Sequence, residues 1–587
     1  MEQSTINFIF CFLIFNQIYE IEPVVVTATR YPKNILEITR GITIIDSLEL
    51  NKYFSLNEIL RNIAVIDMKV RGDNIQADPS IRGSTFQQVL IMIDGVRVND
   101  SQTGHHNLNI PVPLSKIERI EILHGSASSL YGSDACGGVI NIITKKSAGI
   151  AGEFSLGSFN YKDCSGKLAS NKVSIDFETK SSDGHEPGYE YSQYDIATNF
   201  FTSITNNYKI SIFSGYLNKS FGAKNFYAPY PSWEKNQAFF LNLNTQCLIT
   251  PSFLLTPILS FRTHIDTFVL DRNNPTFYAN RHQSFSYGAQ ILGDVDLKNL
   301  GYFAAGIELF RDSLNSTRLG KRKLQRASTF LQAEKKLRDS KIIIISGIRN
   351  DHYWNIKNSI NLHLSAGYKI LPSLKLRSAV ASSFRVPSFT ELYYQDPANL
   401  GDSLLKPESG MEYEFGFDFQ RKKLSTLTTL FYRLTYDDID WVRKSDETVW
   451  QAKNIGSTNF CGAESWIKLN SIRWVDIKTG VSYIRINKSI PDEYISKYAL
   501  QVPNIATSIN ITTFSALDFG LIWQNYYNAD TRFILNMTLS KEFRILKHIK
   551  FISGLTISNL LDKRYEDFQG VSLPGRALRI NTRLTKI

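Results

Sequence analysis

The sequence predicts an all-β transmembrane barrel that is preceded by a small α+β domain. The first observation is a strand in which apolar and polar side chains alternate, as expected where one face meets lipid and the other meets water. One face of this strand carries Met411, Tyr413, Phe415, Phe417 and Phe419, and the other carries Glu412, Glu414, Asp418 and Gln420. The second observation is a high aromatic content, with 37 Phe, 28 Tyr and 7 Trp, beside a mean hydropathy of −0.18. Membrane barrels combine these features, because only alternate residues face lipid and aromatic girdles mark both interfaces.

The amino terminus carries an apolar run at residues 6–15. About ten residues are too few to span a bilayer, but they suit the apolar region of a secretory signal. We therefore predict a signal peptide at residues 1–20, although no lysine or arginine precedes the run. Residues 22–30 (EPVVVTATR) then predict an extended strand, for which the neighbouring sequence offers no hairpin partner.

Charge and cysteine usage exclude several classes of protein. The net charge of +11 is spread along the chain and does not gather on one periodic face, so it does not indicate nucleic-acid binding. No catalytic or phosphate-binding motif occurs, and the sequence predicts neither an enzyme nor a bound cofactor. The cysteines show no metal-ligand spacing and are predicted as isolated thiols; they are Cys11, Cys136, Cys164, Cys247 and Cys461.

Residues 41–148 predict the small α+β domain. Strands are expected at residues 42–45 and 65–70, and Ser55 with Glu58 predicts the start of a short helix. Residues 89–98 predict a hairpin that turns at Asp94-Gly95. A domain of about a hundred residues with so small a core is only marginally stable alone.

Residues 117–146 (IERIEILHGSASSLYGSDACGGVINIITKK) close this domain. Ser115 and Glu118 match a capping box, so we expect a helix to begin here. A short strand at 120–123, a turn of small residues and a β-branched strand at 139–144 follow.

Four segments together resemble the TonB-dependent outer-membrane receptors. They are residues 79–100 (PSIRGSTFQQVLIMIDGVRVND), 117–146, 384–408 (FRVPSFTELYYQDPANLGDSLLKPE) and 559–565 (NLLDKRY). The first two are similar to the plug domain of that family, and the last two to its barrel strands. The resemblance implies about 22 antiparallel strands over residues 149–587, with the plug domain, residues 41–148, inside the lumen.

The resemblance also implies that residues 21–40 hold a TonB box and a linker. In the family, the box docks on the periplasmic protein TonB by adding a strand to a sheet edge. An ordinary edge strand is the alternative reading of the same residues. The box is assigned to Glu22, Pro23, Val24, Val25, Val26, Thr27 and Ala28.

Ligand contacts are expected from the plug loop at 99–109 and from long outer segments at 215–236, 266–284 and 387–409. In the plug loop the expected residues are Asp100, Gln102, His105, His106 and Asn107. A histidine pair without a third ligand is a weak metal signal, so hydrogen bonding to ligand or barrel wall is favoured and no metal site is assigned. The outer aromatic residues either contact ligand or pack in the girdle; they are Phe226, Tyr227, Tyr230, Trp233, Phe277 and Tyr278.

Ion pairs are expected to hold the plug inside the barrel. Arg82 and Arg119 lie in the resembling segments, and Glu412 and Glu414 lie on the inward face of their strand. A buried arginine needs a carboxylate, because an unpaired buried charge is costly. We therefore expect both arginines to pair with these glutamates.

The resemblance implies a monomeric receptor that takes up a scarce large ligand across the lipopolysaccharide-containing outer membrane of a Gram-negative bacterium. Its partner would be TonB with the inner-membrane energising complex. Overall size and the absence of an added signalling domain favour cobalamin as the ligand, and a ferric siderophore or other metal chelate is the alternative. A passive or structural outer-membrane barrel is the alternative of a different class.

Overall fold

The computed structural model describes residues 25–26, 33–34, 37–146, 148–472, 475–491, 493–497, 503–513, 517–526, 531–546 and 548–586. The predicted signal peptide lies outside these residues. So does most of the predicted TonB box, namely Glu22, Pro23, Val24, Thr27 and Ala28.

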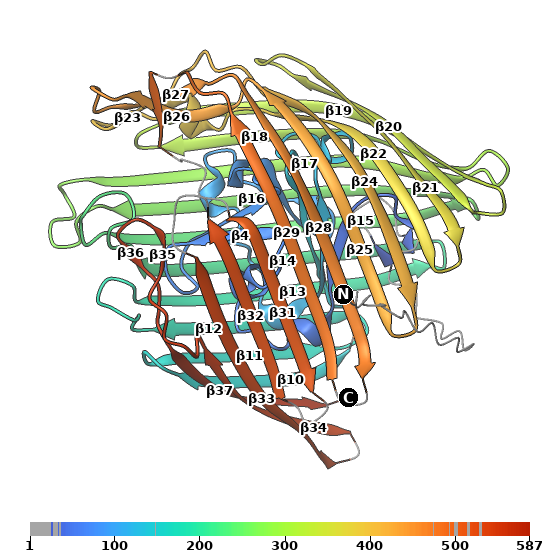
Figure 1. Cartoon of the computed structure of the whole chain (residues 1–587), viewed down its shortest axis with the longest axis horizontal. Helices are drawn as coiled ribbons and strands as arrows, with labels where there is room; N and C mark the ends of the chain where they lie inside the picture. The colour runs from blue at the N-terminus through green and yellow to red at the C-terminus, as the bar shows by residue number, and fades with distance from the viewer. Residues whose placement is uncertain are drawn as a thin grey trace, which may run out of the picture.

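Twenty-two antiparallel strands form a closed barrel around the amino-terminal domain, as predicted (Figure 1). The first strand pairs with the second and also with the last, so the ring leaves no open edge in its hydrogen bonding. In order around the ring the strands are β10 (Gly149–Gly157), β11 (Tyr161–Ala169), β12 (Val173–Ser182), β13 (Tyr191–Thr205), β14 (Tyr208–Gly222), β15 (Trp233–Thr250), β16 (Phe253–Val269), β17 (Ala279–Asp296), β18 (Tyr302–Ser316), β19 (Gly320–Leu337), β20 (Ile342–Tyr353), β21 (Ser359–Leu371), β22 (Leu374–Arg385), β24 (Glu408–Arg421), β25 (Leu424–Tyr436), β28 (Ser457–Ile472), β29 (Val475–Lys488), β31 (Pro503–Thr513), β32 (Leu517–Tyr526), β33 (Arg532–Leu546), β34 (Ile549–Ser558) and β37 (Ala577–Lys586).

The predicted alternation is confirmed along β24. Tyr413 and Phe415 lie on the outside, whereas Glu412 and Glu414 are buried inside the barrel. The same pattern holds in β12, where Phe177 is exposed and Asp176 is buried. The outer face is therefore apolar, as a lipid-facing surface must be.

A charge on this outer face is expected to destabilise the barrel in a bilayer. Phe415 is 51% exposed at the middle of β24, so we expect Phe415→Arg to cost about 2–4 kcal/mol of folding free energy. Denaturant titration of folding into lipid vesicles would measure the cost. Phe415→Leu keeps the site apolar and is the control; equal losses for the two variants would show that residue 415 does not face lipid.

The two ends of the barrel differ in their connections. At the end that we name the turn end, strands join through short turns such as the Asn206-Asn207 pair between β13 and β14. At the other end, the loop end, the connections are longer, at residues 183–190, 223–232, 270–278, 386–407, 437–456 and 559–576. Two of these loops, 223–232 and 270–278, are shorter than the predicted outer segments 215–236 and 266–284. The strands β14, β15, β16 and β17 extend into those segments.

The loop end carries its own small elements, which lie at the left of Figure 1. They form one four-stranded sheet and one hairpin, and a short helix precedes the sheet. The elements are α4 (Phe389–Tyr393), β23 (Asn399–Leu400), β26 (Ile439–Lys444), β27 (Trp450–Asn454), β30 (Tyr494–Ser496), β35 (Glu566–Phe568) and β36 (Val571–Ser572).

The amino-terminal domain, drawn in blue in Figure 1, fills the lumen as a plug. A five-stranded sheet in the order β3-β8-β9-β6-β7 forms its centre, and β4 pairs with β5 beside it. Ser55 caps a helix, and Asp94 and Gly95 both adopt positive φ in the hairpin turn, as predicted. The strands are β3 (Ile42–Ile45), β4 (Ile66–Val70), β5 (Ala77–Ile81), β6 (Val89–Ile93), β7 (Val96–Arg97), β8 (Ile117–His124) and β9 (Gly138–Thr144). The helices are α1 (Ser47–Leu50), α2 (Leu56–Arg61) and α3 (Ser128–Tyr131), with 3-10 turns η2 (Phe86–Gln88), η3 (Gly104–His106) and η4 (Leu114–Lys116).

The prediction of a helix that begins at Ser115 is wrong. Residues Leu114–Lys116 form a single 3-10 turn, and β8 begins at Ile117. β8 pairs with β3 on one side and β9 on the other, so its backbone groups find partners in the sheet. Its β-branched isoleucines pack into the plug core, and this tertiary packing overrides the capping signal.

The amino-terminal strand has a hairpin partner that the sequence did not reveal. Val25–Val26 (β1) pairs antiparallel with Lys33–Asn34 (β2). The expectation that β1 has no nearby partner is therefore wrong.

The four described cysteines are free thiols, as predicted: Cys136, Cys164, Cys247 and Cys461. Burial raises the pKa of the Cys136 thiol to about 12, so it stays protonated. Among the described residues, no helix is long and apolar enough to cross a membrane.

Candidate functional site: the plug–barrel interface and the loop end

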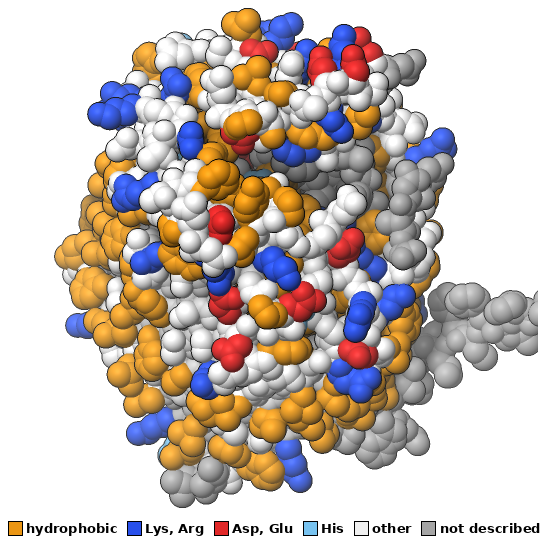
Figure 2. All heavy atoms as spheres, turned by 90° about the vertical axis from the view of Figure 1, so that its left-hand side faces the viewer, with side chains coloured by type: hydrophobic (Ala, Val, Ile, Leu, Met, Phe, Trp, Pro, Cys, Tyr) orange, Lys and Arg blue, Asp and Glu red, His pale blue; other side chains and the backbone are white. Residues whose placement is uncertain are grey.

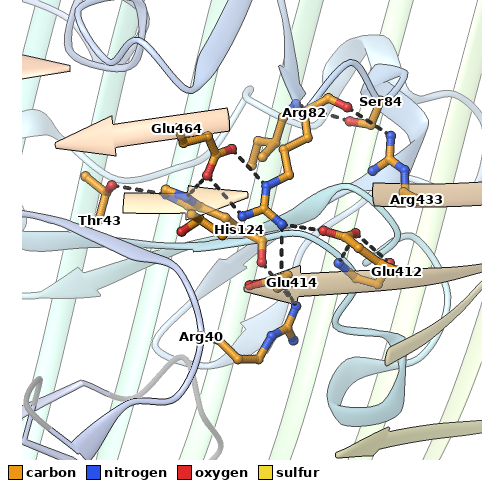
Figure 3. Close-up of polar contacts among 12 residues, drawn as sticks. Arg40, Thr43, Arg82, Ser84, His124, Glu412, Glu414, Arg433 and Glu464 are labelled. Atoms are coloured by element: carbon orange, nitrogen blue, oxygen red, sulfur yellow. Dashed lines mark hydrogen bonds and ion pairs between the residues drawn. The ribbon is translucent and has the colours of Figure 1, made fainter. Parts of the chain in front are cut away.

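Arg82 is the centre of a buried ionic cluster between plug and barrel (Figure 3). It follows β5 in a turn where Arg82 and Gly83 both have positive φ. Its guanidinium contacts Glu412 and lies 3.1 Å from Glu414 Oε1 and 2.8 Å from Glu464 Oε1. Three barrel carboxylates thus converge on one plug arginine from β24 and β28.

Two further plug side chains extend this group, which we call the Arg82 cluster. His124 Nδ1 lies 3.0 Å from Glu464 Oε2, and Arg40 donates to Glu414 Oε1 over 3.2 Å. Glu412 accepts from the backbone N–H and the hydroxyl of Ser126. The neighbouring Gly125 has a positive φ, and a Cβ there would lie 2.2 Å from Glu412 Oε1, so this close approach requires glycine.

The structure brings three of the four predicted plug-holding residues together and leaves one out. Arg82, Glu412 and Glu414 are in contact, but Arg119 bonds to Glu118 and Glu121 within the plug. The expected pairing of Arg119 with Glu412 and Glu414 is therefore wrong. Sequence reasoning missed Arg40, His124 and Glu464. Of these three, only Glu464 could have been found from the sequence, because it is a carboxylate on the inward face of a strand with alternating side chains.

Asp100 anchors the plug loop at 99–109 to the barrel wall. Its Oδ2 accepts from Arg262 Nη1 at 3.1 Å and from Ser284 Oγ at 2.8 Å, and lies 3.0 Å from His264 Nδ1. Burial raises the pKa of this carboxyl, but Arg262 and His264 outweigh burial and hold it far below its ordinary value. Asp100 is therefore an ionised barrel contact in this structure.

The other predicted loop residues are also packed inside the protein. Gln102 and Asn107 are buried, and Asn107 accepts from the Asp100 backbone N–H. The two histidines diverge: His105 Nδ1 lies 2.9 Å from Asp78, whereas His106 faces Glu234 and Asp266 on the barrel. Burial lowers the pKa of His105 and outweighs the opposing effect of Asp78.

Helix α4 covers this plug loop. The backbone N–H groups of Phe389 and Thr390 donate to the carbonyls of Ser101 and Gln102 over 2.9 and 3.0 Å. The start of α4 therefore contacts the plug loop at Ser101 and Gln102.

The predicted outer aromatic residues separate into exposed and buried groups. Tyr227 and Phe277 are 51% and 58% exposed, and Tyr230 packs 5.9 Å from Phe277 between ring centroids. Phe226 is buried in a hydrophobic cluster, and Trp233 is the first residue of β15. The hydroxyl of Tyr278 lies 3.0 Å from that of Tyr394. Figure 2 faces the loop end, where apolar side chains lie between charges of both signs.

Three cavities between plug and barrel are small, with volumes of about 50, 60 and 130 Å³. Sites for small molecules usually enclose roughly 300–1,000 Å³. A large ligand would therefore first meet the loop end and not these cavities.

Comparison with known proteins decides the family. Residues 156–549 match the family model of the TonB-dependent receptor-like β-barrel, and residues 34–139 match that of the TonB-dependent receptor plug domain. The chain belongs to the TonB-dependent receptor family. This is a family of transport receptors.

Relatives of this TonB-dependent receptor are distant in sequence. The vitamin B12 transporter BtuB of Vibrio cholerae is 23% identical over 95% of each chain. Among solved structures, a mutant of the ferric enterobactin receptor PfeA of Pseudomonas aeruginosa has a TM-score of 0.77 at 16% identity, over 96% of this chain and 100% of that one. The siderophore receptor PirA of the same species has a TM-score of 0.74 at 18% identity, over 93% and 99%. These structures share the fold, and at such identities they leave the ligand open.

Proposed function

We propose that this receptor takes up cobalamin actively across the outer membrane, with TonB supplying the force. The observation that carries the proposal is the plug itself, which fills the barrel and is held there by the buried Arg82 cluster. A filled lumen argues against a passive pore. The full-length similarity to curated vitamin B12 transporters supports cobalamin as the ligand.

The amino-terminal segment offers a path for force from the TonB box to the plug. Lys375 Nζ donates to the carbonyl of Ile38 over 2.7 Å, and Thr39 Oγ1 lies 2.7 Å from Ser365 Oγ, both on the barrel wall. Arg40 then shares Glu414 with Arg82. A pull on residues 22–28 would break these contacts in order and reach the Arg82 cluster through Glu414.

Aromatic rings at the loop end are proposed as the first ligand contacts, in particular the exposed Tyr227 and Phe277 and the half-buried Tyr230. A ferric siderophore is the second candidate ligand, because arginines lie over the rings there. Arg318 lies 4.3 Å from the ring centroid of Tyr278, and Arg322 lies 3.8 Å from that of Tyr393. These cations would suit an anionic chelate.

Deletion of residues 22–28 tests the transport class. We expect uptake to fall to the level of cells without TonB, while ligand binding to the purified receptor stays unchanged. Binding is measured with cobalamin and with ferric siderophores on the same protein, which also decides between the ligands. Unchanged uptake after the deletion would instead indicate a passive or structural barrel.

A further inference from the structure

Three ionisable side chains meet at the plug–barrel interface near the loop end, beside Asp100. His106 comes from η3 of the plug, Glu234 is the second residue of β15, and Asp266 lies near the end of β16. Because Asp266 pairs in register with Asn236, the two carboxylates are diagonal neighbours on the same inward face. All three residues are buried.

Glu234 and Asp266 face different nitrogens of the His106 ring, so His106 can place only one of these nitrogens on a metal ion shared by the three residues. His106 Nδ1 lies 3.8 Å from Glu234 Oε1, and His106 Nε2 lies 3.5 Å from Asp266 Oδ2. Both separations exceed the usual N–H···O range of about 2.7–3.2 Å. One ligand atom from each residue lies within 4.8 Å of the others. Two ligands of a tetrahedral zinc ion lie roughly 3.3–3.6 Å apart, so the ligand atoms would have to move together by up to about 1.2–1.5 Å.

The two carboxylates also lack the arginine that neighbouring buried carboxylates have. Asp100 is bound by Arg262, and Asp78 by Arg71. Within the described part of the chain, no lysine or arginine forms an ion pair with Glu234 or Asp266, and Asp266 Oδ1 has no hydrogen-bond partner. Buried carboxylates of this kind call for a cation.

The two buried carboxylates require a cation at this place, and either a proton on His106 or a metal ion can supply the charge.

A fourth ligand would have to come from His282 on the adjacent strand, which lies outside the group of ligand atoms within 4.8 Å of one another. His282 on β17 pairs directly with Asp266 in register, so both side chains lie on the inward face. Ser316 Oγ lies 2.8 Å from His282 Nδ1, which leaves Nε2 as the nitrogen that can turn toward a metal. Such an outer contact fixes the orientation of a ligating imidazole.

We propose that His106, Glu234, Asp266 and His282 bind one divalent transition-metal ion of the zinc class, which fastens the plug loop to the barrel wall. Two imidazoles and two carboxylates suit zinc, cobalt or nickel better than calcium, which prefers oxygen ligands alone. The ion joins η3 of the plug to three barrel strands, so the site exists only while the plug is seated. The proposal is independent of which ligand the receptor transports.

Equilibrium dialysis of the purified receptor, first stripped with a chelator, tests the site with Zn²⁺. We expect one Zn²⁺ per chain, no displacement by excess Ca²⁺, and a higher thermal unfolding temperature with Zn²⁺ than with chelator. Co²⁺ should bind with the visible absorption of a four-coordinate N/O site. In Glu234→Gln and Asp266→Asn, which keep side-chain shape, we expect Zn²⁺ binding to weaken at least about 100-fold.

Matched variants separate this site from general surface binding. His105→Gln changes the neighbouring histidine, and Glu178→Gln removes a buried carboxylate on β12; both should bind Zn²⁺ like the unmodified receptor. His106→Gln should lose the Co²⁺ spectrum, whereas the far-ultraviolet circular dichroism of every variant should match that of the parent. Equal Zn²⁺ binding by the parent and by Glu234→Gln, or a Co²⁺ spectrum unchanged in His106→Gln, would overturn the proposal and leave a protonated His106 as the partner of both carboxylates.

Discussion

Replacing Arg82 with alanine is expected to weaken the docking of the plug by about 3–5 kcal/mol. The guanidinium is fully buried against Glu412, Glu414 and Glu464, and its removal leaves three carboxylates with too little positive charge. Hydrogen exchange provides the measurement, because the N–H of Ser126 is bonded to Glu412 and exchanges only when this region opens. We expect the free energy of that opening to fall by the stated amount.

Arg119→Ala is the matched control for this experiment. Arg119 pairs with Glu118 and Glu121 of the plug, and among the described residues it forms no ion pair with Glu412, Glu414 or Glu464, so its removal leaves the Arg82 cluster intact. We therefore expect no change in the opening free energy at Ser126, even though the buried Glu121 loses a partner. A fall in the opening free energy at Ser126 as large in Arg119→Ala as in Arg82→Ala would mean that the cluster does not hold the plug.

Cells that produce Arg82→Ala should also admit large antibiotics without TonB.

Arg82 and Arg119 show which contacts could be predicted from the sequence and which could not. Alternation correctly placed Glu412 and Glu414 inside the barrel, because the period of two residues is a local property. The prediction for Arg119 was wrong because of how β8 packs. Its isoleucines lie in the plug core, and Arg119 contacts Glu118 and Glu121 on the same strand. Which plug residue meets which strand depends on the rotation of the plug in the lumen, and no local pattern encodes that rotation.

The histidine pair illustrates the same limit. His105 and His106 are adjacent, yet one meets Asp78 of the plug and the other meets Glu234 and Asp266 of the barrel. The two carboxylates lie more than a hundred residues along the chain from His106 and become neighbours only through the register of β15 and β16. The absence of a third ligand in the local sequence therefore says nothing about the folded site.

A disulfide between residues 39 and 365 is expected to abolish uptake while leaving ligand binding intact. Thr39 Oγ1 and Ser365 Oγ lie 2.7 Å apart and are buried, so a Thr39→Cys and Ser365→Cys pair can meet the geometry of a disulfide. The bond would fix the segment after the TonB box to β21, and a pull from the box could no longer reach Arg40 and Glu414. Uptake by cells before and after reduction is the measurement, in a background where the exposed Cys164 is serine.

A second disulfide within the barrel provides the control. Thr538 and Thr556 face each other on β33 and β34, with hydroxyl oxygens 3.1 Å apart. Linking them joins two parts of the wall that do not move relative to each other, so the Thr538→Cys and Thr556→Cys pair should transport at the normal rate. Reduction should restore uptake only in the 39–365 pair. Full uptake by the oxidised 39–365 pair would contradict the proposed path of force. It would mean that residues 37–40 stay bonded to the barrel wall during transport.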